Sequence, residues 1–460
     1  MITIGCGCGS ALDWIEPSSR LIEEGLDYMI LETIGTAATC QAAKRAHDGG
    51  VGYHPYLEDR LEVLLGPAAE HGTTIVTNAG IVDPIGAGQL ARQVADDEGV
   101  SVQVISITGD DCMDLITDDP DQFDTASSDA ISANAYIGAE EVIGALERLD
   151  PEYDAHVVIG GRLSDPALVV GPLVHEFGWA LDDWDRLGQA TVIGHLLECS
   201  AQVTGGYFCD PPRKPVEDLY RIGYPYAEVT EDGTAVVTKP EGSGGRVDRH
   251  TVREQLFYEV HDPSEYVQPD VVADFTTVEL AEVGEDRVEV SGGTGRERPE
   301  DLKVLIGSIA GYQFEKFIPL GGPNAVGRAE VIIENVEKRL EHIFEVDRSR
   351  IDLRMEILGV NGLYGDAYRD GSRTGYTNRT DEHEEVILRV AGNAPEEELL
   401  DPALRTVSTT LPGPGGSGIA IPYAAGGITE KAEIEPVYLP RERVTRGIDY
   451  VELTSRRTRA

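Results

Sequence analysis

The segment Gly161-Arg162-Leu163-Ser164-Asp165 carries the residue types that suggest chemistry most directly. It follows an apolar run, so we expect it to leave the end of a strand, where binding residues collect in α/β proteins. A guanidinium there suits bidentate binding of a carboxylate or of a phosphate such as those of CoA. Asp165 would serve as a base or as a metal ligand. The alternative is an Arg162–Asp165 ion pair that only braces the loop.

A second candidate is a polar stripe within the apolar stretch 192–208. His195, Glu198 and Gln202 recur at helical spacing, which predicts that they share one helix face. Buried polar side chains must be paired. Lining a pocket is one way to pair them, with His195 and Glu198 as candidates to move a proton, and a satisfied core histidine is the other. The H-E-x-x-H pattern of metalloproteases does not occur here.

The glycine-rich segment 5–10 follows the first apolar run of the chain. Gly7, Gly9 and Ser10 would let backbone N–H groups approach a phosphate or carboxylate. The glycines do not match G-x-G-x-x-G, so a dinucleotide site is disfavoured and a tight turn is the alternative. Cys6 fits a small buried hydrophobe better than a thiolate nucleophile.

Oxygen-bearing side chains follow three other apolar runs. Glu32, Asn78 and the pair Asp110-Asp111 would suit Mg²⁺ if they met. Acids that cap the next helix look the same in sequence, and clustered carboxylates arise by chance in an acid-rich chain. We therefore predict no metal site and keep Asn78 as a substrate-binding candidate.

A repeated strand–turn–helix pattern would position these candidates. Five short apolar runs, each followed by small or polar residues, alternate with amphipathic stretches, which predicts an α/β fold with a mostly parallel sheet and flanking helices. The five runs are 2–5, 28–31, 73–77, 102–107 and 156–159. Ligands bind beyond the carboxyl ends of such strands. Ser10, Asn78 and Arg162 should then face one common hollow.

The rest of the chain divides into an irregular extension and a second domain. Residues 1–295 are expected to form the α/β domain, with residues 166–290 as its irregular part. Residues 300–460 show two β-α-β patterns, which predict a ferredoxin-like α+β domain that ends with a strand at 432–438. A glycine-rich loop at 413–418 lacks the Walker A lysine, and a nucleotide-dependent enzyme using it is a weaker alternative.

The charge excludes several partners. Asp and Glu number 82 against 38 Lys and Arg, which gives a formal net charge of -44. Such a surface repels nucleic acid and anionic membranes. Molar salt screens the self-repulsion, so we expect a salt-adapted cytoplasmic protein, with an ordinary acidic protein as the alternative. The six cysteines are too few for a disulfide scaffold.

Several further motifs carry a resemblance along nearly the whole chain. They are Gly5–Ser10, Thr77–Gly80, Ala133–Ala139, Gly161–Leu168, Gly194–Cys199, Gln202–Phe208 and Tyr258–Pro263. In these motifs, in this order, the sequence resembles the acyclic terpene utilisation (AtuA) family. The family is named for clusters that degrade citronellol- and geraniol-type compounds through branched acyl-CoA esters.

That resemblance implies an enzyme of acyclic terpenoid or branched acyl-CoA or carboxylate catabolism. Hydration, isomerisation and hydrolysis all remain open, as does the requirement for a cofactor. The alternative is a non-catalytic binding or assembly subunit of an acyl-CoA-processing complex. In either case we expect a small carboxylate or acyl-CoA as ligand, and a homo-oligomer.

Overall fold

The structure, a computed structural model, describes residues 1–117, 130–362, 385–408 and 427–456. The chain forms two compact units, one made of residues 1–307 and 434–460 and the other of residues 308–433. The glycine-rich loop expected at 413–418 lies outside the described residues. Within the described residues, no helix combines the length and the apolar character that a membrane crossing requires.

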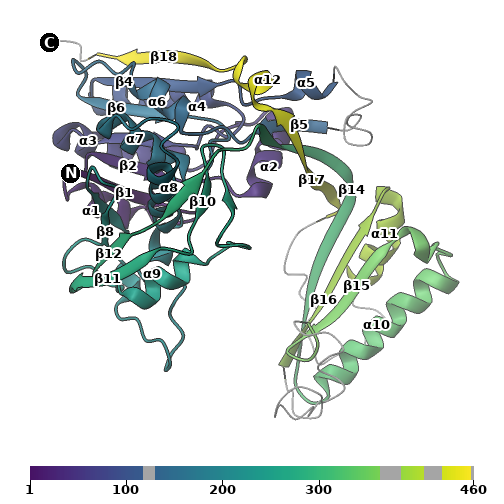
Figure 1. Cartoon of the computed structure of the whole chain (residues 1–460). Coiled ribbons are helices and arrows are strands. Elements are labelled where there is room, and N and C mark those ends of the chain that lie inside the picture. The colour runs from purple at the N-terminus through teal and green to yellow at the C-terminus, as the bar shows by residue number, and fades with distance from the viewer. Residues whose placement is uncertain (118–129, 363–384, 409–426, 457–460) are drawn as a thin grey trace. The chain divides into compact units, whose positions relative to one another are not determined.

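A ten-stranded sheet organises the first unit (Figure 1). In spatial order its strands are β11 (Glu279–Gly284), β12 (Arg287–Ser291), β8 (Ala235–Thr238), β7 (Tyr226–Val229), β1 (Ile2–Cys8), β2 (Tyr28–Leu31), β3 (Thr74–Thr77), β6 (Ala155–Ile159), β4 (Val102–Thr108) and β18 (Asp449–Ser455). The five central strands, β1, β2, β3, β6 and β4, are all parallel to one another. They are the five runs expected from the sequence, so the prediction of a mostly parallel α/β sheet is confirmed.

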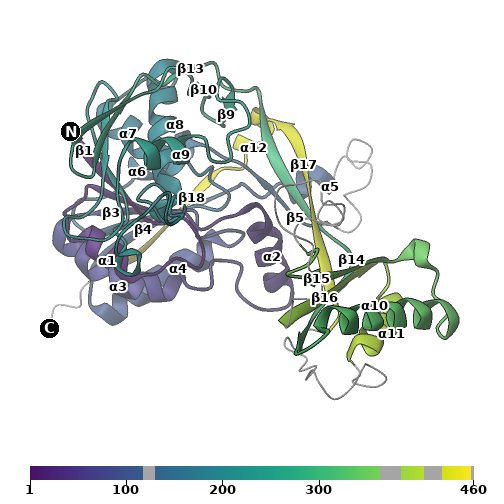
Figure 2. The ribbon, with the colours of Figure 1, turned by 90° about the horizontal axis from the view of Figure 1, so that it is seen from below.

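Helices cover both faces of this sheet (Figure 2). The helices of the unit are α1 (Glu16–Ile22), α2 (Thr36–His47), α3 (Leu57–His71), α4 (Pro84–Glu98), α5 (Met113–Thr117), α6 (Ala139–Leu146), α7 (Ala167–Phe177), α8 (Trp184–Glu198), α9 (Arg249–Leu256) and α12 (Arg441–Thr445). Helices α1, α3 and α4 pack on one face, and α6, α7 and α8 on the other. The central strands are therefore mostly apolar, as expected of strands buried on both faces.

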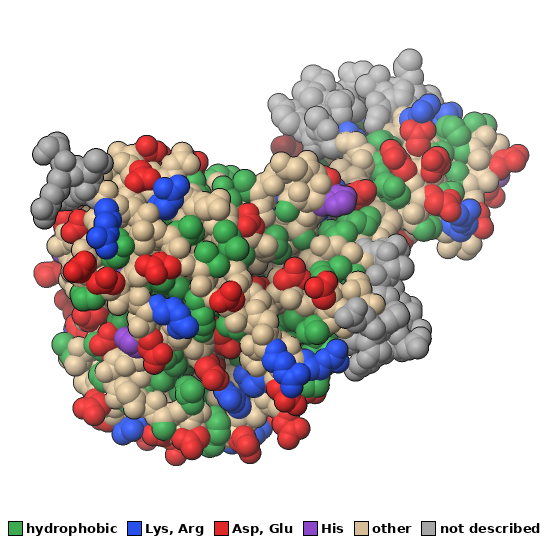
Figure 3. Space-filling model, turned by 90° about the horizontal axis from the view of Figure 1, so that it is seen from above, with side chains coloured by type: hydrophobic (Ala, Val, Ile, Leu, Met, Phe, Trp, Pro, Cys, Tyr) green, Lys and Arg blue, Asp and Glu red, His purple; other side chains and the backbone are tan. Residues whose placement is uncertain are grey.

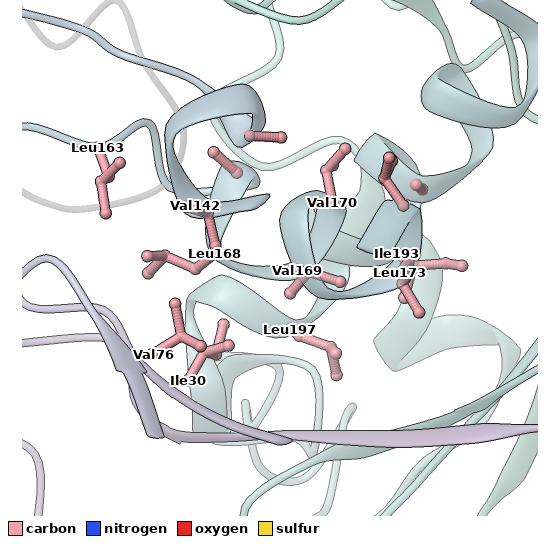
Figure 4. Packing of buried hydrophobic residues seen from close by; sticks show 14 of the residues in the cluster. Ile30, Val76, Val142, Leu163, Leu168, Val169, Val170, Leu173, Ile193 and Leu197 are labelled. Carbon is pink, nitrogen blue, oxygen red and sulfur yellow. The ribbon is translucent and has the colours of Figure 1, made fainter. Parts of the chain in front are cut away.

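Alternate side chains of each strand supply the two cores. On β2, Met29 and Leu31 join the core under α1 and α3, whereas Ile30 joins the core under α7 and α8, as the two-residue period of a strand requires. Figure 4 shows Ile30 and Val76 packed toward Leu168 and Leu197. Such fully buried aliphatic side chains each contribute about 1.5–3 kcal/mol to the hydrophobic stabilisation.

The antiparallel edges include two hairpins and correct one sequence prediction. Strands β7 and β8 pair around Asp232-Gly233, and β11 pairs with β12. The strand expected to end the chain, β17 (Thr429–Pro440), is followed by α12 and β18. Because β18 pairs with β4, the chain end belongs to the first unit. Three short strands, β9 (Tyr266–Val267), β10 (Val272–Asp274) and β13 (Thr294–Arg296), form a separate sheet.

The second unit is an antiparallel sheet with two helices. Its elements are β14 (Asp301–Gly321), which begins in the first unit, α10 (Ala325–His342), β15 (Asp352–Leu358), β16 (Glu385–Ala394), α11 (Glu397–Ser408) and β17. The sheet order is β15-β16-β14-β17. A ferredoxin-like domain has this succession of elements, and its assignment here stays a prediction. Residues 434–460, which we expected in this domain, pack in the first unit.

Candidate functional site

A cavity of about 630 Å³ lies at the carboxyl ends of the parallel strands. The segments that follow β1, β2, β5 (Ala130–Ala135) and β6 line it, together with the end of α8. Nine residues were predicted from the sequence to be catalytic or substrate-binding, and six of them lie in the cavity wall: Gly9, Ser10, Arg162, Asp165, Glu198 and Gln202. Its volume is typical of a small-molecule site.

The other three lie behind the wall. Gly7 belongs to β1, which continues to Cys8, and its position packs against Met29 and Leu31. The amide of Asn78 accepts from the Thr33 N–H at 2.9 Å and donates to the Glu32 carboxyl at 3.3 Å. His195 is buried beneath Glu198. Asn78 and His195 thus contact residues that line the cavity without lining it themselves.

The glycine segment has a packing role in addition to lining the cavity. The Gly9 N–H donates to the Asp13 carboxyl at 2.9 Å, so this N–H is already paired. A Cβ at residue 9 would overlap the Cys199 backbone and the Glu198 carbonyl oxygen. The absence of a side chain therefore lets β1 and the end of α8 meet, which brings Glu198 to the cavity.

Arg162 is held rigidly at the end of β6. Its side chain is 2% exposed, and Nη1 donates to Asp165 Oδ1 at 3.0 Å and to the Leu163 carbonyl at 3.1 Å. Its backbone N–H donates to Asp110 Oδ2 at 2.9 Å. Within the described residues the buried Nε has no hydrogen-bond partner. Both sequence interpretations describe parts of this geometry: Arg162 pairs with Asp165, and it also keeps an unused donor.

A second cation faces the same aromatic ring as Arg162. The Arg162 guanidinium lies 3.8 Å from the ring centroid of Tyr136, and Lys303 Nζ lies 4.1 Å from it. Lys303 comes from β14 and lines the cavity, half-buried. No carboxylate in the described parts of the chain pairs with it. Two cations that stack on one ring favour the binding of an anionic ligand group beside them.

His195 and Glu198 form a buried pair. His195 Nδ1 lies 2.9 Å from Glu198 Oε1, and Nε2 lies 3.0 Å from the Gln255 carbonyl oxygen. A carbonyl oxygen only accepts, so Nε2 carries a hydrogen. Burial lowers the pKa of His195 to about 4, so the imidazole is neutral and Nδ1 accepts. The hydrogen between the two residues then belongs to the Glu198 carboxyl group.

The electrostatics of Glu198 agree with that assignment. Burial raises the pKa of Glu198 well above its ordinary value, and the Asp165 and Glu259 carboxylates raise it further. Its Oε2 has no hydrogen-bond partner among the residues described. Glu198 therefore presents an unpaired oxygen of a protonated carboxyl group at the cavity wall.

Glu32 is a second buried carboxyl group in the wall. Burial raises its pKa well above the ordinary value, with Asp165 adding to the effect and the Ile34 N–H and Arg162 opposing it. Its Oε1 accepts from the Ile34 N–H at 2.6 Å. Five carboxyl groups line the cavity, those of Asp13, Glu32, Asp165, Glu198 and Glu259. Glu32 and Glu198 are the buried ones whose pKa is raised well above the ordinary value, burial also raises the pKa of the less buried Asp13, and Asp165 is ion-paired.

The Mg²⁺ alternative does not assemble. Asp110 accepts from the Asn134 amide and the Arg162 backbone, and Asp111 accepts from the Met113 N–H at the start of α5. Glu32 lines the cavity, whereas Asp110 lies behind it. Across the described residues, no group of three His, Cys, Asp or Glu residues could hold a metal ion.

Cysteine nucleophiles are also poorly placed. Cys6 is fully buried, and burial raises the pKa of its thiol well above the ordinary value. Cys199 lines the cavity, but burial raises the pKa of its thiol too. A thiolate is the reactive form, so neither site favours thiolate chemistry.

The sequence interpretation missed several wall residues and one helix boundary. Helix α8 ends at Glu198, and Gln202 lies in the following 3-10 turn rather than on the same helix. Tyr136 lies in a conspicuous motif, but nothing in the motif shows which way the ring points. Lys303 had no signal at all, since it is a single lysine in an ordinary β pattern.

The fold and the cavity define an α/β protein with a small-molecule site at the carboxyl edge of a parallel sheet. The model of the family described as "Acyclic terpene utilisation family protein AtuA" matches residues 2–450. The chain therefore belongs to that family, and the resemblance drawn from the sequence motifs is confirmed. Neither the curated proteins nor the solved structures contain a match to the chain.

Proposed function

We propose that this protein is an enzyme of acyclic terpenoid breakdown that transfers protons to and from a branched carboxylate or acyl-CoA ester. The family supports a role in acyclic terpene utilisation. The proton-transfer chemistry rests on one observation, two buried carboxyl groups of raised pKa, Glu32 and Glu198, in a cavity that also holds Arg162. Carboxyl groups tuned in this way act as general acids and bases near neutral pH.

The roles follow from the contacts. Arg162 and Lys303 would bind the carboxylate or thioester oxygen and stabilise negative charge that develops on it. Asp165, held by Arg162, would accept a proton from the substrate carbon. Glu32 would return one at another carbon, or Glu198 would do so after its O–H turns from His195 Nδ1 toward the cavity. The net reaction is an isomerisation. If water instead adds to the protonated alkene and loses a proton, the net reaction is a hydration.

Hydrolysis through a covalent cysteine intermediate is disfavoured by the raised pKa values of the Cys6 and Cys199 thiols. The other interpretation, a non-catalytic binding or assembly subunit, draws no support from the cavity. A subunit that only binds has no use for buried carboxyl groups that hold protons, since each costs stability at neutral pH.

The composition motivates broader proposals. Acidic side chains are spread over the face of the molecule in Figure 3, in keeping with the net charge of -44. We propose a salt-adapted cytoplasmic homo-oligomer that binds a small-molecule ligand and neither nucleic acid nor membranes.

Deuterium incorporation tests the proposed chemistry. The whole protein in buffered KCl and D₂O is incubated with a branched C10 unsaturated acid, its pantetheine thioester and its CoA thioester, and the products are analysed by mass spectrometry. We expect incorporation into at least one of the three, slowed about 100-fold or more in E32Q and E198Q. Arg148→Ala is the control for general effects of substitution. Arg148 stacks on Tyr450 as Arg162 stacks on Tyr136, but it lies outside the cavity. No incorporation into any of the three by the native protein would refute the proposal.

A further inference from the structure

A second hollow, of about 540 Å³, has a charge opposite to that of the chain as a whole. We call it the basic hollow, and its wall includes Phe208, Arg213, Lys214, Arg246, Arg253 and Phe257. Glu254 is the one carboxylate in the wall, and His250 completes it. Four cations therefore meet in one place on a protein whose acids outnumber its bases 82 to 38.

Two of these four cations are paired, and the other two have no carboxylate partner among the residues that the structure describes. Lys214 pairs with Glu254, and Arg246 pairs with Asp248. Arg213 and Arg253 are exposed and have no carboxylate partner within the parts of the chain that the structure describes. In a strongly acidic chain, two unpaired arginines in one hollow indicate a binding site for a multiply charged anion rather than structural ion pairs.

The aromatic side chains add a flat surface to the charge. Phe208 is buried, with Lys214 Nζ 4.7 Å and the Arg246 guanidinium 5.6 Å from its ring centroid. Phe257 is 50% exposed. An exposed phenyl ring beside free arginines offers a stacking surface for a nucleobase whose phosphates contact the arginines.

The basic hollow adjoins the site cavity. Phe208 and Phe257 line the basic hollow, and the residues next to them in the chain, Tyr207 and Tyr258, line the site cavity. Consecutive Cα atoms lie about 3.8 Å apart. The rings of Tyr207 and Tyr258 are in edge contact, with their centroids 6.3 Å apart. The segments 207–208 and 257–258 therefore border both hollows, and the Tyr207 side chain is 67% exposed.

We propose that the basic hollow binds the phosphorylated adenosine end of a CoA thioester whose acyl end occupies the site cavity. The phosphates contact Arg213 and Arg253, the adenine stacks on Phe257, and the pantetheine arm passes over the outside of the Tyr207–Tyr258 ring pair. This inference rests on the proposed function and narrows its substrate class, from carboxylate or thioester to CoA thioester. Direct contacts of this kind persist in concentrated salt, where longer-range attraction is screened.

Calorimetric titration of the whole protein at fixed KCl tests the nucleotide site. The ligands are a branched C10 acyl-CoA, the same acyl group on pantetheine, adenosine 3′,5′-bisphosphate and inorganic pyrophosphate. We expect the CoA thioester to bind at least about tenfold more tightly than the pantetheine thioester, and R253A or R213A to remove about tenfold of that affinity. Phe257→Ala should weaken adenosine bisphosphate binding and leave pyrophosphate binding unchanged.

Arg249→Ala is the matched control, since Arg249 is an exposed arginine on the same helix, α9, but pairs with Glu282 and does not line the hollow. Equal affinities for the two thioesters, or equal losses in R253A and R249A, would overturn the nucleotide site. If F257A binds adenosine bisphosphate as well as the native protein does, the hollow is only an anion patch and the proposal is wrong.

Failure of this proposal can be told from failure of the proposed function. Deuterium incorporation into the pantetheine thioester requires only the site cavity. If it occurs while R253A and R249A bind the CoA thioester alike, the chemistry stands and the nucleotide site falls. If adenosine bisphosphate binding depends on Arg253 while no thioester exchanges, the nucleotide site stands and the proposed chemistry falls.

Discussion

Replacement of Lys303 by methionine separates ligand binding from folding. Lys303 lines the site cavity, and its ammonium group faces the ring of Tyr136 at 4.1 Å without a carboxylate partner among the described residues. Methionine fills a similar volume and removes only the charge and the donor. We expect the K303M variant to fold normally and to bind anionic ligands weakly.

The structure gives the expected size of both effects. A half-buried cation–π contact contributes about 1 kcal/mol, so the melting temperature should fall by roughly 2 °C or less. A charge-assisted hydrogen bond to a ligand oxygen is worth roughly 1.5–3 kcal/mol, which corresponds to roughly a ten- to hundredfold loss of affinity. Binding should therefore suffer far more than stability.

The assay compares a branched C10 acid with the alcohol of the same carbon skeleton, by calorimetric titration in fixed KCl. K303M should lose affinity for the acid and keep its affinity for the alcohol within about threefold, because only the acid offers an anionic oxygen. Lys338→Met is the control, since Lys338 is a surface residue paired with Glu334. Equal losses for acid and alcohol, or no loss for either, would refute the role given to Lys303.

Three further predictions concern the neighbouring residues. Glu198→Gln should gain stability relative to the native protein as the pH rises above the ordinary glutamate pKa of 4.5, because the folded native state retains a proton that the unfolded chain releases. Urea unfolding at about pH 5 and about pH 8 measures this, each unit of pKa difference counting about 1.4 kcal/mol, and a stability difference that does not change with pH would contradict it. Cys199→Ala should retain deuterium incorporation within about threefold, because burial raises the pKa of this thiol, whereas a covalent cysteine mechanism predicts near-complete loss of exchange. Gly9→Ala should destabilise the protein by about 1–3 kcal/mol, since its Cβ would overlap the Cys199 backbone, and an unchanged melting temperature would show that the contact is not tight.

The parallel sheet could be predicted because its physics is local. A strand buried on both faces must be a short apolar run, and the turn after it must be small or polar. The runs that became β1, β2, β3, β6 and β4 carry both signals. The rule that ligands bind beyond the carboxyl ends of such strands then placed Arg162 and Ser10 in one wall without knowledge of any long-range contact.

The rest of the site depends on contacts that local patterns do not encode. Lys303 reaches the cavity because β14 runs past Tyr136, whose N–H donates to the Lys303 carbonyl oxygen at 2.8 Å. Nothing near residue 303 in the sequence signals that contact. In the same way β18 is a mixed polar and apolar segment at a sheet edge, and only its pairing with β4 shows that the chain end returns to the first unit.

The protonation of Glu198 is the most direct test of the proposed chemistry. Infrared difference spectroscopy at neutral pH, between the native protein and E198Q, reports whether this carboxyl group holds a proton. We predict a carboxylic-acid carbonyl band in the native protein that is lost in E198Q, and a second one that is lost in E32Q. If the native spectrum shows only ionised carboxylates, the cavity has no proton to donate and the proposed chemistry is wrong.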